Sequence, residues 1–157
     1  MFENERYAQA AVAFRRAGQD KKAKMCDAYL LQEKAGLIST TASSARKQAF
    51  LTAAKAFLAC VHNSQRVEER LTCHHAAGDC YFNARDLKSA GDNYRLAELY
   101  PEAACTFQEG RCFDEMVKVI TQHKSAFTDD LHKKLTMDAR MYYFKVCSDG
   151  RFVSEIL

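Results

Sequence analysis

One spacing pattern recurs along this chain and constrains its fold more than any other feature. A large ring or Leu is followed by a small residue three positions on, a ring seven on and a small residue ten on. On an α-helix, which turns by ~100° per residue, these offsets fall within an arc of about 80°. Each copy therefore predicts one helix with a single packing face. The copies, the last of them degenerate, are Tyr7/Ala10/Phe14/Ala17, Phe50/Ala53/Phe57/Cys60, Leu87/Ala90/Tyr94/Ala97, Tyr100/Ala103/Phe107/Gly110 and Phe113/Met116/Ile120/His123.

Internal repetition of this kind is typical of stacked helical hairpins. The chain of 157 residues has one Pro and six Gly, and helix formers are plentiful. Alternating apolar and polar positions are hard to find, so no strand is predicted. We therefore expect an all-α fold: a right-handed α-solenoid of stacked antiparallel helical hairpins, forming a single domain over residues 1–157.

Glycine and aspartate punctuate the predicted helices. Gly18 is expected to end the first helix in a left-handed conformation, and Asp20 to cap the second, which ends near Gly36. The predicted organisation is a first hairpin over 1–36, a flexible loop over 37–44, a repeat array over 45–123 and a terminal helix over 128–150. Within the array, Asp86 is expected to cap a helix at 87, and further helices begin at 100 and 113, a pitch of 13 residues.

Residues 71–104 resemble a tetratricopeptide repeat, which is 34 residues long. The usual Pro at the end is missing and the following units are shorter, so the array is a degenerate one. Gly78 is expected to let two helices cross closely, with Ala90 facing the crossing. The resemblance implies a protein-binding scaffold. The residues that carry it are Ala77, Gly78, Tyr81, Leu87, Ala90, Tyr94 and Ala97.

A broader resemblance covers most of the chain. The runs at 2–18, 49–60 and 110–120 are similar to the helical-repeat region of large fungal proteins with a UvrD-like superfamily 1 helicase core, whose animal relatives are the tetratricopeptide and ankyrin repeat-containing proteins. Such segments flank the ATPase in that family. This chain has no G-x4-G-K-[ST] motif and no other glycine-rich loop. The resemblance implies a segment or relative that lacks the motor.

The charge balance is mild, with a formal net charge of +3. Nucleic-acid modules concentrate a stronger basic excess on one face. The alternative function, a nucleic-acid-binding accessory segment of a helicase, requires one continuous surface to hold the basic residues of the first hairpin and of the last helix. Those residues are Arg15, Arg16, Lys21, Lys22, Lys24, Lys133 and Lys134.

No targeting or membrane-spanning segment is predicted. The N-terminus is acidic where a secretory signal is basic, and Lys55 interrupts the most apolar run. An intracellular protein with no membrane contact is expected. The seven cysteines are predicted to be reduced and mostly buried on helical stripes. The stripe cysteines are Cys26, Cys60, Cys73, Cys80 and Cys105.

No metal, cofactor or catalytic residue is predicted. Cys73 and Cys80, with His74 and His75 between them, lie two helical turns apart, about 10 Å along the axis, so they cannot share one zinc ion. Spacing leaves a Cys–His nucleophilic pair open, because such partners meet in space. Against such a pair, burial raises the pKa of a thiol and makes it inert.

We therefore expect a non-catalytic scaffold that binds an unknown protein or peptide. The first helix of a tetratricopeptide hairpin lines the concave face, which leaves four residues of the fourth predicted helix to meet a partner. Because one of them is an acid where a cation would be needed, a chaperone C-terminal carboxylate is not the expected ligand. The four are His75, Asp79, Phe82 and Asn83.

The two ends carry the last expectation. A solenoid needs polar caps, because an uncapped terminal repeat exposes its apolar stripe. Here the first helix carries a full stripe, and apolar residues follow Gly150. We expect that the chain is a segment of a longer protein or that it self-associates through a terminal face, with Phe2, Phe152 and Ile156 exposed.

Overall fold

The computed structural model describes residues 2–148, and within them the chain is all-helical, without a strand. The all-α prediction is confirmed. Gly150, Phe152 and Ile156 lie outside the described residues, and so does the side chain of Phe2. The elements are α1 (Phe2–Arg16), α2 (Asp20–Leu37), α3 (Ser43–Asn63), α4 (Val67–Asn83), α5 (Leu87–Leu96), α6 (Tyr100–Glu109), α7 (Phe113–Gln122), the 3-10 turn η1 (Lys124–Ala126) and α8 (Asp129–Ser148).

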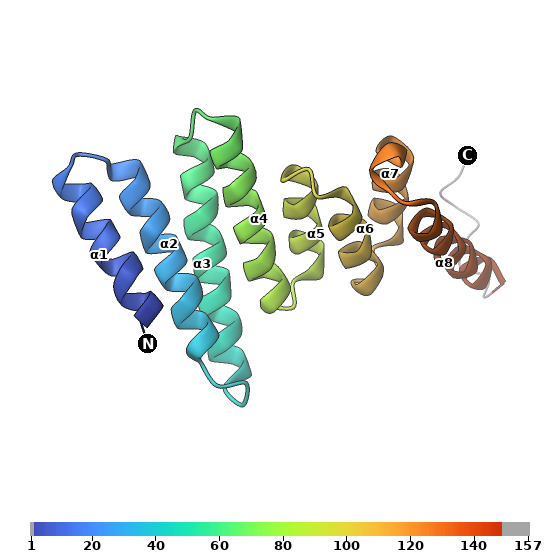
Figure 1. Ribbon diagram of the computed structural model, residues 1–157. Helices are drawn as coiled ribbons and strands as arrows, with labels where there is room; N and C mark the ends of the chain where they lie inside the picture. Colours follow the sequence, from blue (N-terminus) through green and yellow to red (C-terminus); the bar gives the residue numbers. More distant parts are fainter. Residues whose placement is uncertain (1, 149–157) are drawn as a thin grey trace.

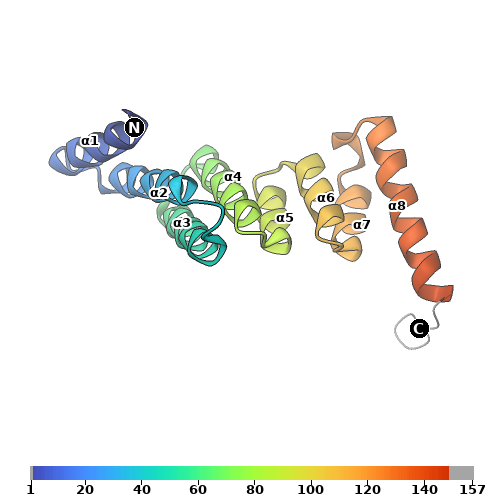
Figure 2. The ribbon, with the colours of Figure 1, turned by 90° about the horizontal axis from the view of Figure 1, so that it is seen from below.

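The helices form a row in which each packs mainly against the next one along the chain (Figure 1). Short turns join them, so consecutive helices from α1 to α6 run in opposite directions. Seen from below, the molecule is elongated, with α1 at one end and α8 at the other (Figure 2). The contact of α8 with α7 is slighter than those between earlier neighbours, and α8 also touches α6.

The predicted pitch of 13 residues is present in α5, α6 and α7. Each has ten residues, and they begin at Leu87, Tyr100 and Phe113. Pro101 lies in the first turn of α6, where its missing N–H removes no helical hydrogen bond. The side chain of Asp86 caps α5 as predicted, because its Oδ1 accepts a hydrogen bond from the Ser89 N–H at 3.2 Å.

Four turns share one backbone geometry, the Schellman motif. In the α5–α6 turn the Leu99 N–H donates to the Tyr94 carbonyl at 2.9 Å, and the Glu98 N–H donates to the Arg95 carbonyl at 3.1 Å. The α1–α2, α4–α5 and α6–α7 turns repeat this pair of bonds. Each turn places one residue in the left-handed region. They are Gly18 at φ 68°, Arg85 at 60°, Glu98 at 62° and Arg111 at 58°.

The left-handed position is occupied by glycine in one turn and by residues with a Cβ in the other three. Gly18 ends α1 as expected, because glycine adopts a positive φ without a steric penalty. The other three turns hold residues with a Cβ at that position, which costs about 1–2 kcal/mol each. At these three turns the left-handed residue itself is not a glycine, although Gly110 caps α6 directly before Arg111.

Two hydrophobic clusters divide the core. One joins α2, α3 and α4 and consists mainly of alanines around Phe50 and Phe57. The other joins α5 to α8 around large side chains such as Phe107, Met116 and Leu135. Tyr81 of α4 packs against both clusters and connects them.

Glycine allows close approach at two successive helix crossings. A Cβ added to Gly78 would lie 2.7 Å from the ring of Tyr94, as the predicted crossing of α4 and α5 requires. A Cβ on Gly91 would lie 2.6 Å from the ring of Phe107, one pitch further on. Ala90 is fully buried in α5.

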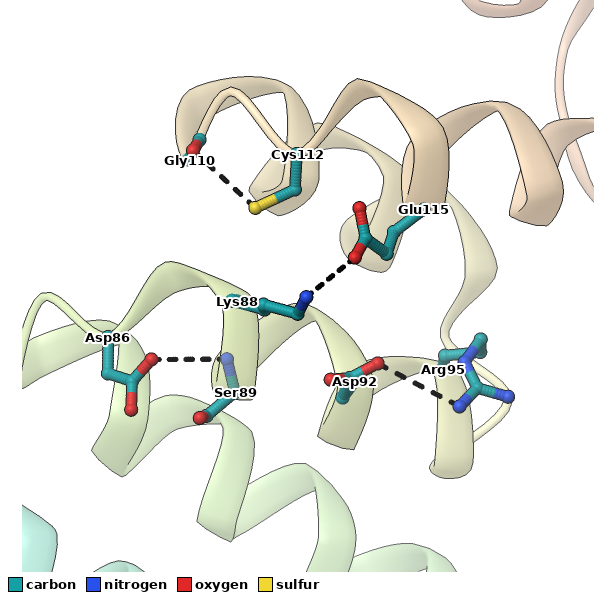
Figure 3. A network of polar contacts seen from close by, with 8 residues as sticks. All are labelled: Asp86, Lys88, Ser89, Asp92, Arg95, Gly110, Cys112 and Glu115. Atoms are coloured by element: carbon teal, nitrogen blue, oxygen red, sulfur yellow. Dashed lines mark hydrogen bonds and ion pairs between the residues drawn. The ribbon is translucent and has the colours of Figure 1, made fainter. Parts of the chain in front are cut away.

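An ion pair connects α5 with its second neighbour, α7. Lys88 Nζ lies 2.7 Å from Glu115 Oε1, as Figure 3 shows beside the Asp86 cap and the Asp92–Arg95 contact. The hydrogen bond between the two side chains raises the pKa of Lys88 and lowers the pKa of Glu115. The α5–α7 repeats are therefore tied together on their surface as well as through the core.

The predicted cap of α2 was wrong. Asp20 is the first residue of α2 and makes no capping bond, since Gln19 precedes it at the cap position. The end of α2 at Leu37 agrees with the prediction that this helix ends near Gly36.

The loop predicted over 37–44 is also shorter, because α3 begins at Ser43. Arg46 Nη1 holds the connection in place by donating to the carbonyls of Gly36 at 2.9 Å and Ile38 at 2.7 Å.

The stripe of α1 differs from the stripes of the later helices. Phe57, Tyr94 and Phe107 are buried as predicted. In α1, Ala17 is exposed and Tyr7 and Phe14 are only half-buried. The reason is that these rings face a hollow, whereas the buried rings of the later helices pack against neighbouring helices.

Candidate partner-binding groove

A hollow lies between α1, α2 and the turn that joins α3 to α4. It has a volume of about 870 Å³, within the range of ligand pockets. Apolar side chains supply most of its walls, and charged side chains of the α1–α2 turn and of the α3–α4 turn surround its opening. We call this hollow the groove, and its described lining includes Tyr7, Phe14, Lys21, Lys22, Lys24, Met25, Cys26, Tyr29, Cys60, Arg66 and Glu69.

Three aromatic rings build one wall of the groove. Tyr7 of α1 stacks on Tyr29 of α2 with ring centroids 5.3 Å apart. Tyr29 in turn meets the buried Phe57 of α3 edge-on at 4.9 Å, which anchors the wall in the core. Phe14 continues the wall towards the α1–α2 turn. Half-buried rings of this kind offer large contact area at little conformational cost.

The rim of the groove is predominantly cationic. Lys21, Lys22, Lys24 and Arg66 line it, against two acids, Asp20 and Glu69. Lys22 Nζ lies 5.5 Å from the centroid of the Phe14 ring, within cation–π range. Basic side chains beside an apolar wall favour a ligand that carries both negative charge and apolar groups.

An ion pair between Arg15 and Asp27 joins α1 to α2 beside the groove. It neutralises one of the two arginines of the basic run at the end of α1, so the positive charge that faces a ligand comes from the lysines of α2 and from Arg66.

Two cysteines line the groove. Cys26 of α2 is half-buried, and Cys60 of α3 has 6% of its surface exposed. Cys73 of α4 is fully buried. The neighbouring Cys73 and Lys24 lower the pKa of the Cys60 thiol, and the neighbouring Cys60 and burial raise the pKa of Cys73.

The expectation that stripe cysteines are buried and inert therefore holds only in part. Cys80 is fully buried, and burial raises its pKa to about 12. Cys105 is exposed, because it lies on the outer side of α6, away from the buried Ala103, Ala104 and Phe107. Cys60 is the thiol with a lowered pKa, since Cys73 and a cation lie beside it.

The four residues predicted to meet a partner lie on successive turns of α4. Asp79 is largely engaged within the fold, because its Oδ1 accepts from the Tyr94 hydroxyl at 2.8 Å and its Oδ2 lies 3.7 Å from His75 Nε2. Asn83 donates to the Asp79 carbonyl at 2.8 Å. Phe82 packs against the α5–α8 core. Partner binding through these residues stays a prediction.

The cysteine–histidine cluster of α4 is accounted for by packing and hydrogen bonds within the fold. His74 and His75 point to different partners, since His74 Nδ1 lies 3.0 Å from Asn93 Oδ1. Within residues 2–148, no group of three or more His, Cys, Asp and Glu side chains converges as metal ligands would. Over the same part of the chain, none of the helices has the length and apolar character needed to cross a bilayer.

The basic groups of the first hairpin and those of the last helix belong to helices at opposite ends of the row. The lysines of α2 lie at one end of the row, and Lys133 and Lys134 lie on α8 at the other (Figure 1). The nucleic-acid alternative stays a prediction. On α8, an apolar row is exposed instead, formed by Met137, Met141 and Phe144. Self-association through this end of the molecule stays a prediction.

Comparison of the chain with protein-family models, with curated proteins and with solved structures gives no match. The resemblances to tetratricopeptide repeats and to the helical region of helicase-bearing proteins stay predictions. The groove and its chemistry are therefore read from this chain's own residues.

Sequence reasoning missed the groove. In the sequence analysis, Lys21, Lys22 and Lys24 counted only among the basic residues that the nucleic-acid alternative requires. The ring spacing of α1 is the same as in the other stripes, so it carries no signal for a hollow.

Proposed function

We propose that this chain is a non-catalytic protein-interaction scaffold that binds an acidic peptide segment with apolar side chains in the groove. The fold that we propose for it is a right-handed α-solenoid of degenerate tetratricopeptide-like hairpins, and the family resemblance favours a segment or relative of a larger helicase-like protein that lacks the motor. The observation that carries the binding proposal is the juxtaposition of an aromatic wall with a lysine-rich rim.

The chemistry of the lining supports a peptide as ligand. Tyr7, Phe14 and Tyr29 present ring surface to apolar side chains, and Lys21, Lys22 and Lys24 surround it with positive charge. Carboxylates of a bound segment would pair with the lysines at the rim, where solvent screens the interaction and charge mainly governs association rate and specificity. The rings supply the larger share of the affinity.

A peptide library displayed on phage tests this proposal. We expect selection on the wild-type protein to enrich acidic sequences with apolar anchors, whose affinity is then measured by fluorescence anisotropy. The triple variant Lys21→Glu/Lys22→Glu/Lys24→Glu is expected to weaken binding at least about tenfold. Phe14→Ala is expected to weaken it as well, with no loss of helix content in circular dichroism.

Matched variants distinguish the groove from α8 and from the face of α4 as the binding surface. Lys133→Glu/Lys134→Glu changes the same charge type on α8, at the other end of the row, and is expected to leave binding unchanged. If His75→Ala/Asn83→Ala abolishes binding while the lysine variant does not, the ligand site is the face of α4 and the groove proposal is wrong.

A nucleic acid is the competing ligand class. Tight binding of a single-stranded oligonucleotide with a steep salt dependence, together with no enrichment of acidic peptides, would replace the peptide proposal by the helicase-accessory alternative.

A further inference from the structure

The outward side of α8 carries an apolar stripe. Met137 and Met141 each have 65% of their surface exposed, and Phe144 has 75%. Their spacings of four and three residues, at ~100° per residue, place the three side chains within an arc of about 60°. The other side of the helix buries Leu135 and Ala139. Within residues 2–148, the stripe is therefore left uncovered on a helix whose opposite face is already packed.

Four basic side chains flank this stripe. All four are exposed, and none makes an ion pair with a residue of 2–148. Two lie on each side, within about 40° of the edge of the stripe, and the set spans about 18 Å of the helix. The acids of α8 do not interrupt the set, because two stand in the first turn and Asp138 accepts a hydrogen bond from Gln108. The cations are Lys133 and Arg140 on one side and Lys134 and Lys145 on the other.

The charge pattern limits the kind of surface that covers the stripe. A second copy of α8 would bring its own flanking cations against these, and like charges that meet across an interface oppose association. An acidic protein matches the charge, but the stripe is narrow and convex, so such a partner would need an apolar groove shaped to it. An anionic bilayer needs no matching shape, because its headgroups meet the cations while apolar side chains enter the boundary with the acyl chains.

We propose that the outward face of α8 binds the surface of a bilayer that contains anionic lipids, with the helix lying parallel to that surface. Met137, Met141 and Phe144 enter the boundary between headgroups and acyl chains. The flanking Lys and Arg side chains keep their charges at the level of the headgroups, since their long aliphatic stems extend along the apolar layer. The binding is peripheral and reversible.

This inference replaces the expectation of no membrane contact. That expectation considered targeting signals and spanning segments, and a peripheral helix gives neither signal. No helix of residues 2–148 is suited to crossing a bilayer, in agreement with a peripheral mode. The inference is also independent of the groove, because α8 lies at the end of the row opposite to α1 (Figure 2).

Co-sedimentation of the full chain with large unilamellar vesicles tests the proposal. The vesicles consist of phosphatidylcholine alone or with about 30% phosphatidylserine, which gives an anionic surface. The affinity for the anionic vesicles is expected to be at least about tenfold higher than for the neutral ones, because the cations of α8 add to the apolar contribution. It is expected to fall as the salt concentration rises, since salt screens the surface charge.

The apolar stripe is tested without a change in charge. The variant Met137→Ser/Met141→Ser/Phe144→Ser keeps every cation and is expected to bind anionic vesicles at least about tenfold more weakly. Because the three side chains are exposed, the helix content in circular dichroism is expected to stay the same.

The cations of α8 are compared with those of α2, at the other end of the row. Two triple Lys→Glu variants make the same change in net charge. The α8 variant is expected to lose vesicle binding, and the α2 variant is expected to bind as the wild type does. The two variants are Lys133→Glu/Lys134→Glu/Lys145→Glu and Lys21→Glu/Lys22→Glu/Lys24→Glu.

A single tryptophan reports whether the stripe enters the bilayer. The chain contains no Trp, so Phe144→Trp introduces one reporter on the stripe. Its emission is expected to shift to the blue with anionic vesicles and to be quenched by lipids brominated on their acyl chains. Leu96→Trp, at an exposed position of α5, is the control that is expected to show neither change.

Each of three results would overturn the proposal. Equal vesicle binding by the wild type and the serine variant would show that charge alone attracts the protein. Equal loss in the two lysine variants would show that α8 is not the binding face. Absence of binding to anionic vesicles would do so as well, and sedimentation velocity then shows whether the stripe instead forms a dimer, whereas binding of an acidic peptide that the serine variant abolishes would assign it to a protein partner.

Discussion

The helices α1–α4 and the helices α5–α7 differ in their lengths and in the side chains that they bury. The first four have 15, 18, 21 and 17 residues, whereas each of the other three has ten. The buried residues of the first group are mostly alanine and cysteine, and those of the second group include Tyr94, Phe107, Met116 and Ile120. We call these groups the long-helix half and the short-repeat half.

This difference in helix length and side-chain size explains where the molecule leaves room for a ligand. Large side chains at a constant pitch fill the space between short helices, and glycine at the crossings admits the rings. Alanines let long helices approach each other but fill little volume, so the rings of α1 are left beside a hollow. The candidate site therefore lies in the half with the less regular spacing.

The largest expected difference is between two rings at the same stripe position, Phe107 and Phe14. Phe107 is fully buried, so Phe107→Ala is expected to lower the free energy of unfolding by about 3–5 kcal/mol. Phe14 is half-buried beside the groove, so Phe14→Ala is expected to cost about 1 kcal/mol or less. Urea unfolding followed by circular dichroism measures both, and equal losses would break the comparison.

The second prediction concerns glycines inside helices of the two halves. Gly91→Ala places a methyl group against the fixed ring of Phe107 and is expected to cost about 1–3 kcal/mol. Gly36→Ala in α2 meets no atom within 4 Å, so it is expected to be neutral or to stabilise by up to about 1 kcal/mol. Thermal unfolding compares the two, and a stabilising Gly91→Ala would show that the short-repeat half is not tightly packed.

The third prediction sharpens the role of the repeated turn. Arg111 adopts φ 58° and makes no ion pair with any residue of 2–148, so Arg111→Gly is expected to stabilise the protein by up to about 1 kcal/mol. Arg85→Gly should gain less, because it also removes the 2.9 Å contact with Glu109. Arg111→Lys is the control without a change in backbone preference. A destabilised Arg111→Gly would contradict the steric account of the turn.

The smallest expected effect is that of the surface pair between α5 and α7. Lys88 lowers the pKa of Glu115, so Lys88→Gln is expected to raise the midpoint of the Glu115 carboxylate in an NMR titration. Because the folded pKa is the lower one, the stabilisation from this pair is present at neutral pH and is lost as the pH falls through that value. An unchanged midpoint would show that the pair is not formed in solution.

Regular features of the fold could be predicted from the sequence, and features that depend on the shape of side chains could not. The constant pitch identified α6 with its observed bounds, and the Asp86 cap followed from residue type and position. Asp20 misled because residue type alone does not tell which of two neighbouring polar residues precedes the helix, and Gln19 occupies the cap position.

The candidate site was not predictable, for a physical reason. The ring spacing in α1 is the same as in the helices whose rings are buried, so the stripe alone does not reveal that Tyr7 and Phe14 face a hollow. The residues proposed on α4, led by His75 and Asp79, came from a family analogy, and the groove is not lined by them.

Hydrogen–deuterium exchange with and without a saturating acidic peptide from the library tests the central claim most directly. The account predicts slower exchange in α1, in the first half of α2 and around the α3–α4 turn, with α5, α6 and α7 unchanged. Slower exchange confined to the short-repeat half, or to residues 74–83 of α4, would contradict it.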